Sequence, residues 1–219
     1  FSKEFGKDVV HSIIMDVTDE KDVKNAVSES INFFGGIDIL VANAGFASAA
    51  LFEKTSTKLW DKNMDILSKG CFLISREVYQ NMMQQNNGGS IIFVSSKNSL
   101  NASKGASAYS VAKSSLLHLS RSIALEGSVY KIRSNVVNPD AVIQNSKIWQ
   151  GDWTKQRAKS NKINVKEVEE FYKNRSLLKV SILPEDIAEG IYFFASSKSK
   201  KSTGNIINVD GGNITSFTR

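Results

Sequence analysis

The sequence predicts an α/β fold, in which helices cover both faces of a doubly wound, mostly parallel sheet. Three observations carry this prediction. Short runs rich in β-branched residues alternate with longer segments of helical periodicity. One run, Ile37–Ala42, is almost wholly apolar, as expected of a central parallel strand buried on both faces. Polar or small residues follow most of these runs, at the edge where open parallel sheets bind ligands.

Strands and helices are predicted to alternate along the chain. The predicted strands lie near Val10–Met15, Ile37–Ala42, Ser90–Val94, Arg133–Val137 and Asn205–Val209. The predicted helices lie near Glu20–Phe34, Thr57–Gln85, Ala106–Glu126, Val165–Asn174 and Glu185–Ala195. The length of 219 residues suits one hydrophobic core, so residues 1–219 are predicted to form a single domain.

One long segment has no clear period. Residues 144–166 leave the sheet before the chain returns to it, and they contain Trp149 and Trp153. Irregular insertions at the rim of a sheet are often lids or substrate-binding loops. The two tryptophans therefore line a substrate site or cap the core, and the sequence leaves both interpretations open.

The composition excludes several classes of protein. The net charge is +6, but the basic residues are spread along the chain, with one tight cluster at Lys198, Lys200 and Lys201 that we interpret as a solvated turn. A basic stripe with interleaved aromatics is missing, so no nucleic-acid partner is expected. No apolar run approaches the roughly 20 residues of a membrane span. The single cysteine, Cys71, and the absence of a signal peptide before Phe1 indicate a reducing, cytoplasmic setting.

Chemistry-bearing residues follow the predicted strands. Asp16, Asn43, Ser96 and Asn138 each stand at or just after a strand end. Tyr109 and Lys113 begin a helical stretch, and their spacing of four residues places the phenol and the ammonium on one helix face. A nearby cation favours the phenolate and lowers the pKa of the tyrosine, so such a pair can serve as general acid and base toward a carbonyl or hydroxyl.

In these motifs the chain resembles the short-chain dehydrogenase/reductase family over essentially its whole length, and a Rossmann-like fold is implied. The features that match are Asp16-Val17-Thr18-Asp19, the Asn43-Ala44-Gly45 turn, Trp60, Gly70, Ser96, Tyr109 with Lys113, Asn138-Pro139 and Val209-Asp210-Gly211-Gly212. The resemblance implies an oxidoreductase that transfers hydride between NAD or NADP and a small alcohol or carbonyl, and it leaves the choice of dinucleotide open. It also implies a homo-oligomer, dimeric or tetrameric.

The resemblance also implies a role for each matching residue. Tyr109 is the proton donor or acceptor, Lys113 binds the nicotinamide ribose and tunes Tyr109, and Ser96 orients the substrate. Asp16 and Val17 hold the adenine, Asn43, with Ala44 and Gly45, lies on the ribose side, and Val142 meets the nicotinamide amide. Trp149 and Trp153 are the candidate substrate contacts.

Within the family, one subgroup is most similar. Asn138-Pro139-Asp140-Ala141-Val142, followed by Ser146–Trp149 and Gly151–Trp153, resembles the dehydrogenase domain of bifunctional rhamnulose-1-phosphate aldolase/alcohol dehydrogenases. This similarity implies a small hydroxyaldehyde or hydroxyacid of the lactaldehyde type as the substrate. Leu67 stands where most members of the family carry a catalytic asparagine, and the subgroup shares the leucine.

The larger departure from the family pattern lies at the amino terminus. The family's glycine-rich turn and the two strands around it are missing before Asp16, and neither Gly35-Gly36 nor Gly88-Gly89 follows a strand. We therefore expect the Val10–Met15 strand to move into the vacant central position and to pair in parallel with Ile37–Ala42. Asp16 would then lie away from the adenine, and the affinity for the cofactor would be very weak.

Three interpretations of the chain remain open. The first is a working oxidoreductase with the roles given above, and the second is a non-catalytic truncated remnant that cannot bind the dinucleotide. The third is a fragment whose amino-terminal unit was lost or is supplied by another chain. The remaining polar candidates have structural explanations: His118 should face away from Tyr109, His11 and Cys71 should pack, and no spacing suits a metal site.

Overall fold

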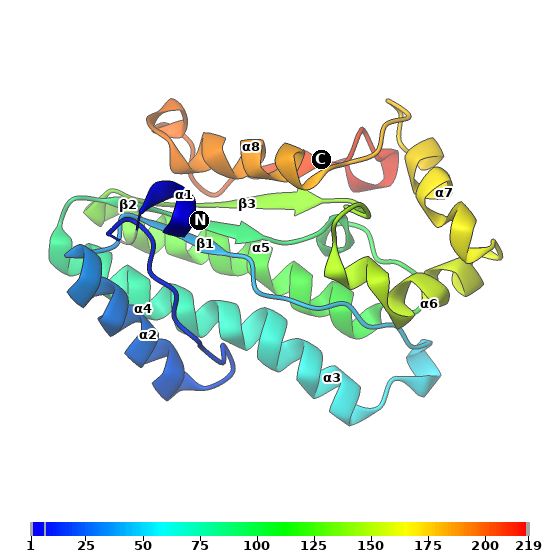
Figure 1. The fold of residues 1–219 in the computed structure, drawn as a ribbon, viewed down its shortest axis with the longest axis horizontal. Helices are drawn as coiled ribbons and strands as arrows, with labels where there is room; N and C mark the ends of the chain where they lie inside the picture. The colour runs from blue at the N-terminus through cyan, green and yellow to red at the C-terminus, as the bar shows by residue number, and fades with distance from the viewer. Residues whose placement is uncertain (1, 7, 218–219) are drawn as a thin grey trace.

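The computed structural model describes residues 2–6 and 8–217 and contains one parallel sheet. Its strands are β1 (Ile39–Ala42), β2 (Gly89–Val94), β3 (Ile132–Pro139) and β4 (Ile206–Val209), in the spatial order β1-β2-β3-β4. Every neighbouring pair is parallel. The predicted α/β class and its parallel sheet are thereby confirmed, and all carboxyl ends of the strands meet at the edge where α6 and α7 lie (Figure 1).

Helices cover both faces of this sheet (Figure 1). On one face lie α2 (Glu20–Phe34), α4 (Gly70–Gln85) and α5 (Ser107–Gly127), and on the other lies α8 (Pro184–Ala195). A short α1 (Ser2–Phe5) precedes them. At the rim stand α6 (Asp152–Asn161) and α7 (Val168–Arg175). The segment that sequence periodicity left without structure therefore contains a helix, α6.

Two apolar clusters hold the layers together. The larger one joins the sheet to α4 and α5 through residues such as Phe93, Met82 and Leu116, all completely buried. The smaller one joins Ile92 and Val137 of the sheet to Phe194 of α8. Because β2 and β3 lie between both clusters, most of their side chains are buried, which explains the apolar sequence of β2 from Ile91 to Val94.

The long helical stretch predicted over residues 57–85 is present with an interruption. It consists of α3 (Thr57–Asn63), a π-helical turn, η2 (Met64–Lys69), and α4. Ser68 in this turn hydrogen-bonds Ser115 of α5 at 2.7 Å. The widened turn carries Leu67, which is fully buried beside Tyr109. Such single π turns are frequent at functional sites.

The prediction that Val10–Met15 forms a strand paired with β1 is wrong. Exposure alternates from His11 to Asp16 as it does in a strand, but residues 10–16 belong to no strand and β1 pairs with β2 alone. The segment is held elsewhere: His11 stacks on Phe33 of α2 at 4.4 Å between ring centroids and hydrogen-bonds Glu29 at 2.6 Å. An alternating pattern predicts an extended chain, whereas a strand also needs a backbone partner.

The outer edge of β1 has no paired strand within residues 2–6 and 8–217. Its side chains are correspondingly more exposed than those of β2, with Ile39 at 48% and Ile92 at 0% of full exposure. The prediction that Ile37–Ala42 is a central strand buried on both faces is therefore wrong: β1 is a half-covered edge, and the packed centre of the sheet is β2 and β3.

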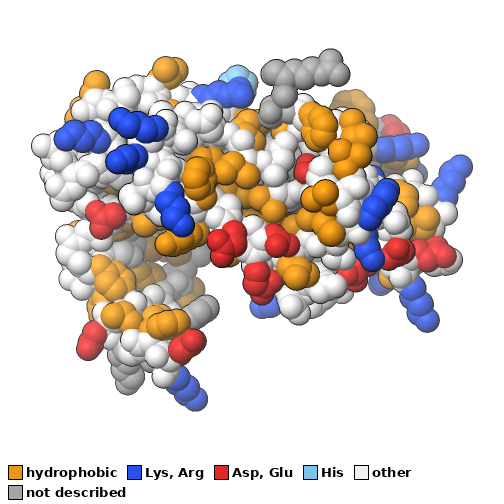
Figure 2. Space-filling model, turned by 90° about the horizontal axis from the view of Figure 1, so that it is seen from above, with side chains coloured by type: hydrophobic (Ala, Val, Ile, Leu, Met, Phe, Trp, Pro, Cys, Tyr) orange, Lys and Arg blue, Asp and Glu red, His pale blue; other side chains and the backbone are white. Residues whose placement is uncertain are grey.

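The lysine cluster after α8 lies where the sequence places it, in a solvent-exposed turn. Lys198, Lys200 and Lys201 are all exposed. Basic side chains gather at that end of the face that Figure 2 shows, apart from the carboxyl ends of the strands.

Candidate active site

A cleft of about 650 Å³ opens at the carboxyl ends of the strands. It is walled by the ends of β1, β2 and β3, by the start of α5 and by the segment from Asp140 through α6. Nine of the predicted site residues line it: Asn43, Ala44, Gly45, Ser96, Tyr109, Lys113, Val142, Trp149 and Trp153. The topology thus brings together residues that are separated by more than a hundred positions in the sequence.

Asp16 and Val17, the predicted adenine contacts, do not line this cleft. Asp16 is exposed, and its carboxylate accepts hydrogen bonds from the amide and the hydroxyl of Thr18, both at 2.8 Å. These bonds lower the pKa of Asp16. Val17 packs against Gly70, where a Cβ would meet its side chain at 2.9 Å. Both residues therefore have local structural roles at the start of α2.

Ser96, Tyr109 and Lys113 form one wall of the cleft. The hydroxyl of Ser96 lies close enough to the phenol of Tyr109 to lower its pKa. The ammonium of Lys113, one helical turn along α5, donates to the backbone carbonyl of Val94 at 2.8 Å. Both α5 side chains are buried, at 9% and 6% exposure. The phenol is therefore held at one position beside a hydroxyl that can share a substrate oxygen with it.

Several serine hydrogen bonds hold the end of β2 against α5. Ser95 donates to the carbonyl of Lys113 at 2.9 Å, and Ser114 donates to the carbonyl of Ser99 at 2.9 Å. Ser99 in turn donates to the carbonyl of Ser96 at 2.6 Å and to the side chain of Asn138 at 3.2 Å. These bonds tie β2, β3 and α5 together at the point where Ser96 meets Tyr109, so the geometry is fixed before any ligand arrives.

Burial is the main cause of the pKa shifts of Tyr109 and Lys113. It raises the pKa of Tyr109, against a smaller lowering by the hydroxyl of Ser96 and a further raising by the charge of Asp140. Burial also lowers the pKa of Lys113 to about 8. The sequence predicts the opposite shift for Tyr109, because it places the ammonium against the phenol. In the structure that ammonium is directed to the carbonyl of Val94, and desolvation of the phenolate dominates.

Gly45 allows a close approach beside Lys113. A Cβ at this position would meet Leu67 at 3.2 Å and the ammonium of Lys113 at 3.9 Å. A larger side chain would fill the space between the end of β1 and the catalytic helix. Leu67 thus occupies, with an apolar group, the position at which the family pattern places an asparagine. Cys71, one turn further on, is buried in the core as the sequence indicated.

Trp149 and Trp153 pack onto the core and also line the cleft. Trp153 is buried at 8% exposure in a cluster with Leu67 and Tyr109, its ring centroid 5.8 Å from that of Tyr109. Trp149 packs edge-on against it at 6.1 Å. Both rings also line the cleft. They cap the core and form the cleft wall at the same time.

Four further residues of the cleft were missed by sequence reasoning. Lys97 and Arg157 are cations buried at 5% and 4% exposure, and Asp140 and Tyr172 lie beside them. Lys97 directly follows Ser96, and Arg157 lies one helical turn after Trp153, so spacing alone could have placed them on the same wall. Their burial could not be seen, because lysine and arginine are normally solvated.

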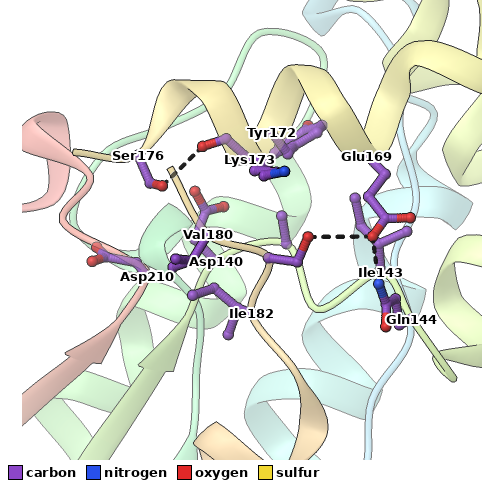
Figure 3. A pocket seen from close by; sticks show the side chains of 12 residues that line it. Asp140, Ile143, Gln144, Glu169, Tyr172, Lys173, Ser176, Val180, Ile182 and Asp210 are labelled. Atoms are coloured by element: carbon purple, nitrogen blue, oxygen red, sulfur yellow. Dashed lines mark hydrogen bonds between the residues drawn. The ribbon is translucent and has the colours of Figure 1, made fainter. Parts of the chain in front are cut away.

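A smaller cavity adjoins the cleft behind Asp140 and Tyr172 (Figure 3). It holds only about 10 Å³, the lower limit for one water molecule. Around it, Glu169 of α7 accepts hydrogen bonds from Gln144 at 2.6 Å and from Ser181 at 3.3 Å. These bonds fasten α7 to the loop after β3, and the cavity itself is too small for an organic ligand.

The residues present suit the nicotinamide half of a dinucleotide. The Asn43-Ala44-Gly45 turn, Val142 and the buried Lys113 surround the part of the cleft next to Tyr109, and Gly45 leaves room for a ring to approach. A pyrophosphate would need a glycine-rich turn after a strand. Among the described residues, Gly35-Gly36 and Gly88-Gly89 both stand before or at the start of a strand.

Other candidates stay outside the site. His118 is exposed, on the side of α5 away from the cleft, as expected from its spacing. No group of three metal-binding side chains occurs within residues 2–6 and 8–217. In that same part of the chain, no helix has the length and apolar character needed to cross a membrane.

Comparison with known proteins assigns the family. Residues 1–213 match a family model described as enoyl-(acyl carrier protein) reductase. An uncharacterized oxidoreductase of Bacillus subtilis, YuxG, is 50% identical over 98% of this chain, which spans 31% of that relative's length. Sorbitol-6-phosphate 2-dehydrogenase of Escherichia coli is 31% identical over 96% of this chain and 81% of its own length.

The fold agrees with these sequence matches. The crystal structure of sorbitol-6-phosphate 2-dehydrogenase SrlD from Erwinia amylovora superposes with a TM-score of 0.92 at 30% identity, over 97% of this chain and 82% of that one. The site found above lies in the segment covered by all these matches. The chain therefore belongs to the short-chain dehydrogenase/reductase family of oxidoreductases.

Proposed function

We propose that this chain catalyses hydride transfer between NAD or NADP and a small alcohol or carbonyl compound. One observation carries the proposal: Ser96, Tyr109 and Lys113 stand together in one wall of a cleft large enough for a nicotinamide and a small substrate. In the direction of oxidation, an alcohol and the oxidised dinucleotide give a carbonyl compound, the reduced dinucleotide and one proton. The dinucleotide supplies the hydride acceptor or donor.

Tyr109 and Ser96 handle the proton at the substrate oxygen. During reduction, the phenol of Tyr109 gives its proton to the carbonyl oxygen as that oxygen gains negative charge, and the hydroxyl of Ser96 donates a second hydrogen bond to it. During oxidation, the same phenol oxygen takes the proton from the alcohol. The raised pKa of Tyr109 suits the acid role, because the phenol keeps its proton at neutral pH until negative charge develops on the substrate oxygen.

Lys113 supplies positive charge at the same place. With a pKa of about 8 it is mostly protonated at neutral pH. A ribose bound next to Gly45 would accept hydrogen bonds from its ammonium, whose one hydrogen-bond partner within residues 2–6 and 8–217 is the carbonyl of Val94. Bringing the ammonium closer to the phenol would lower the pKa of Tyr109 and support its function as a base.

The substrate is proposed to be small and hydroxylated, of the lactaldehyde type. The substrate end of the cleft is walled by Trp149, Trp153 and Asp140, which leave space for a few carbons beside the phenol. The similarity of residues 138–153 to the dehydrogenase domain of rhamnulose-1-phosphate aldolase/alcohol dehydrogenases supports this choice. The name of the Escherichia coli relative, a dehydrogenase of sorbitol 6-phosphate, supports a polyol-like substrate.

The proposal is tested first by titration of NADH and NADPH into the purified chain, followed by fluorescence or calorimetry. Saturable binding in the micromolar range supports it and shows which dinucleotide is preferred. No binding up to millimolar concentration would favour the alternative, a chain that cannot hold the dinucleotide by itself.

Catalysis is then tested with Tyr109→Phe. This variant should bind the dinucleotide like the unchanged chain and lose turnover of lactaldehyde by about a hundredfold or more, because the proton donor is gone. Tyr130→Phe is the matched control and should keep full turnover. Tyr130 lies just before the amino end of β3, whereas the cleft lies at the carboxyl ends of the strands. Equal activity of Tyr109→Phe and Tyr130→Phe would overturn the role of Tyr109.

A further inference from the structure

Lys97 is a buried cation without a carboxylate partner. Its side chain lines the cleft at 5% exposure, and its ammonium donates to the hydroxyl of Ser103 at 2.9 Å and to the carbonyl of Asn101 at 3.4 Å. A lysine ammonium has three donors, so one remains for a ligand. Burial lowers the pKa of Lys97, which is the cost of holding a charge out of water.

Arg157 is a second such cation on the same wall. It is 4% exposed and lines the cleft from α6, and one of its terminal nitrogens donates to the carbonyl of Lys104 at 2.9 Å. Its Nε is buried and has no hydrogen-bond partner in the described part of the chain. Its guanidinium stacks over the ring of Trp153 at 4.6 Å, the same ring that packs against Tyr109.

The nearby carboxylate, Asp140, raises the pKa of Lys97 by its charge, against the larger lowering by burial, but it forms its ion pair elsewhere. Asp140 forms its ion pair with Arg175 of α7 and accepts a further hydrogen bond from Asn213 at 2.9 Å. Neither Lys97 nor Arg157 is within ion-pair distance of a carboxylate among residues 2–6 and 8–217. The charged groups that line the cleft are thus three cations, Lys97, Lys113 and Arg157, and one already paired anion, Asp140.

Buried cations without counter-charge are costly, and proteins keep them where a ligand supplies the opposite charge. The two cations differ in position from the hydride-transfer groups: Lys97 follows Ser96 at the end of β2, and Arg157 lies behind Trp153. Lys113 faces Gly45 and the turn that suits the nicotinamide half, on the other side of Tyr109. The excess positive charge therefore belongs to the substrate end of the cleft.

We propose that Lys97 and Arg157 form an oxyanion-binding subsite, which holds a carboxylate or phosphate group of the substrate while its hydroxyl or carbonyl carbon lies beside Tyr109. This inference rests on the proposed oxidoreductase function and narrows its substrate to a small hydroxy or oxo compound with an anionic end. The ammonium supplies a point charge, and the guanidinium supplies N–H donors in a planar fork that fits either oxyanion.

The subsite is tested by binding alone, without cofactor or turnover, so that its failure is separate from a failure of the oxidoreductase proposal. Trp149 and Trp153 lie next to Arg157, and their intrinsic fluorescence reports occupation of the subsite. Glycerol 3-phosphate, inorganic phosphate, L-lactate and glycerol are titrated into the full chain at constant ionic strength. A saturable change with an anion, and none with glycerol at the same concentrations, is expected.

The anions distinguish the two possible groups. Stronger binding of glycerol 3-phosphate, with competition by inorganic phosphate, assigns a phosphate monoester, whereas saturation by L-lactate alone assigns a carboxylate. In either case Lys97→Met and Arg157→Met should each weaken binding about tenfold or more, because each removes a charged hydrogen-bond donor. Arg157→Lys keeps the positive charge but loses the planar set of N–H donors. Its affinity for the anion should lie between those of the unchanged chain and Arg157→Met.

Lys155→Met is the matched control, since Lys155 lies on the same helix and its side chain is 74% exposed. It should bind like the unchanged chain. Circular dichroism melting shows whether each variant is folded, and if Arg157→Met is not, Lys97→Met decides alone. Equal responses to glycerol and to the anions, or unchanged binding by folded Lys97→Met, would overturn the subsite.

Discussion

The centre of the sheet and its β1 edge differ in strand pairing and in burial. Strands β2 and β3 have neighbours on both sides and helices on both faces, and they end at a fixed set of hydrogen bonds around Ser96 and Asn138. Strand β1 is paired on one side only, and the extended residues 10–16 that could have joined it are fastened to α2 through His11. Both regions belong to the same sheet, but only the centre is fully packed.

This difference separates the chemistry of the site from the binding of its cofactor. The proton-transferring groups depend on β2, β3 and α5, whose positions are fixed by buried packing and buried hydrogen bonds. The turn Asn43-Ala44-Gly45, which suits the nicotinamide half, depends on the open-edged strand β1. Affinity for the dinucleotide is therefore expected to respond to whatever covers that edge, whereas the geometry of Tyr109 is not.

The largest expected change in the free energy of unfolding comes from truncating an isoleucine to alanine at the centre of the sheet, compared with the same change at the β1 edge. Ile92→Ala in β2 should reduce the free energy of unfolding by about 2 to 5 kcal/mol, because Ile92 is completely buried against Phe194 and a cavity would remain. Ile39→Ala in β1 should cost under about 1 kcal/mol, because that side chain is 48% exposed. Urea unfolding of both variants checks this. Equal losses would mean that the β1 edge is covered in solution.

The buried ammonium of Lys113 predicts a pH-dependent stability. The pKa is about 8 in the folded chain and 10.5 is the ordinary value, so between these pH values the unfolded chain holds the extra proton. The free energy of unfolding should therefore rise with pH through this window, by about 2 kcal/mol from pH 7 to pH 9.5. Lys113→Met should lack this rise. Its free energy of unfolding should exceed that of the unchanged chain by the largest amount below pH 8.

The measurement is urea unfolding of both chains at pH 7 and pH 9.5. The effect of Lys113 is the difference between them, because the raised pKa values of Cys71 and Tyr109 oppose the rise in both chains. Lys155→Met, at an exposed position, serves as the control and should follow the unchanged chain at both pH values. An identical pH dependence in Lys113→Met and the unchanged chain would contradict the burial of that ammonium as a charge.

The smallest effect is expected where residues 10–16 contact α2. His11→Ala removes a stacked ring and a hydrogen bond to Glu29, both partly solvated, and should cost under about 1 kcal/mol in the free energy of unfolding. Ile14→Ala, at a fully exposed side chain, should cost nothing measurable. Thermal or urea unfolding of the two variants would show it. A loss of several kcal/mol at either position would mean that this segment packs against more than α2.

Much of the fold and of the site could be predicted from the sequence. The apolar runs at residues 37–42 and 90–94 each predicted a strand, but only the second is an inner one, since residues 39–42 form the edge strand β1. The spacing of Tyr109 and Lys113 placed both on one helix face, and Ser96 at a strand end placed its hydroxyl at the same edge of the sheet. These are local rules, and the local sequence contains all that they need.

What only the tertiary structure decided depends on partners distant in the sequence. The β-branched residues of segment 10–15 predicted an extended backbone, but a strand also requires a neighbouring edge, and His11 instead contacts α2. The shift in the pKa of Tyr109 depends on how deeply α5 is buried and on Lys113 meeting the carbonyl of Val94. The burial of Arg157 arises because α6 packs against the segment before α5, where its guanidinium meets the carbonyl of Lys104, a partner distant in the sequence.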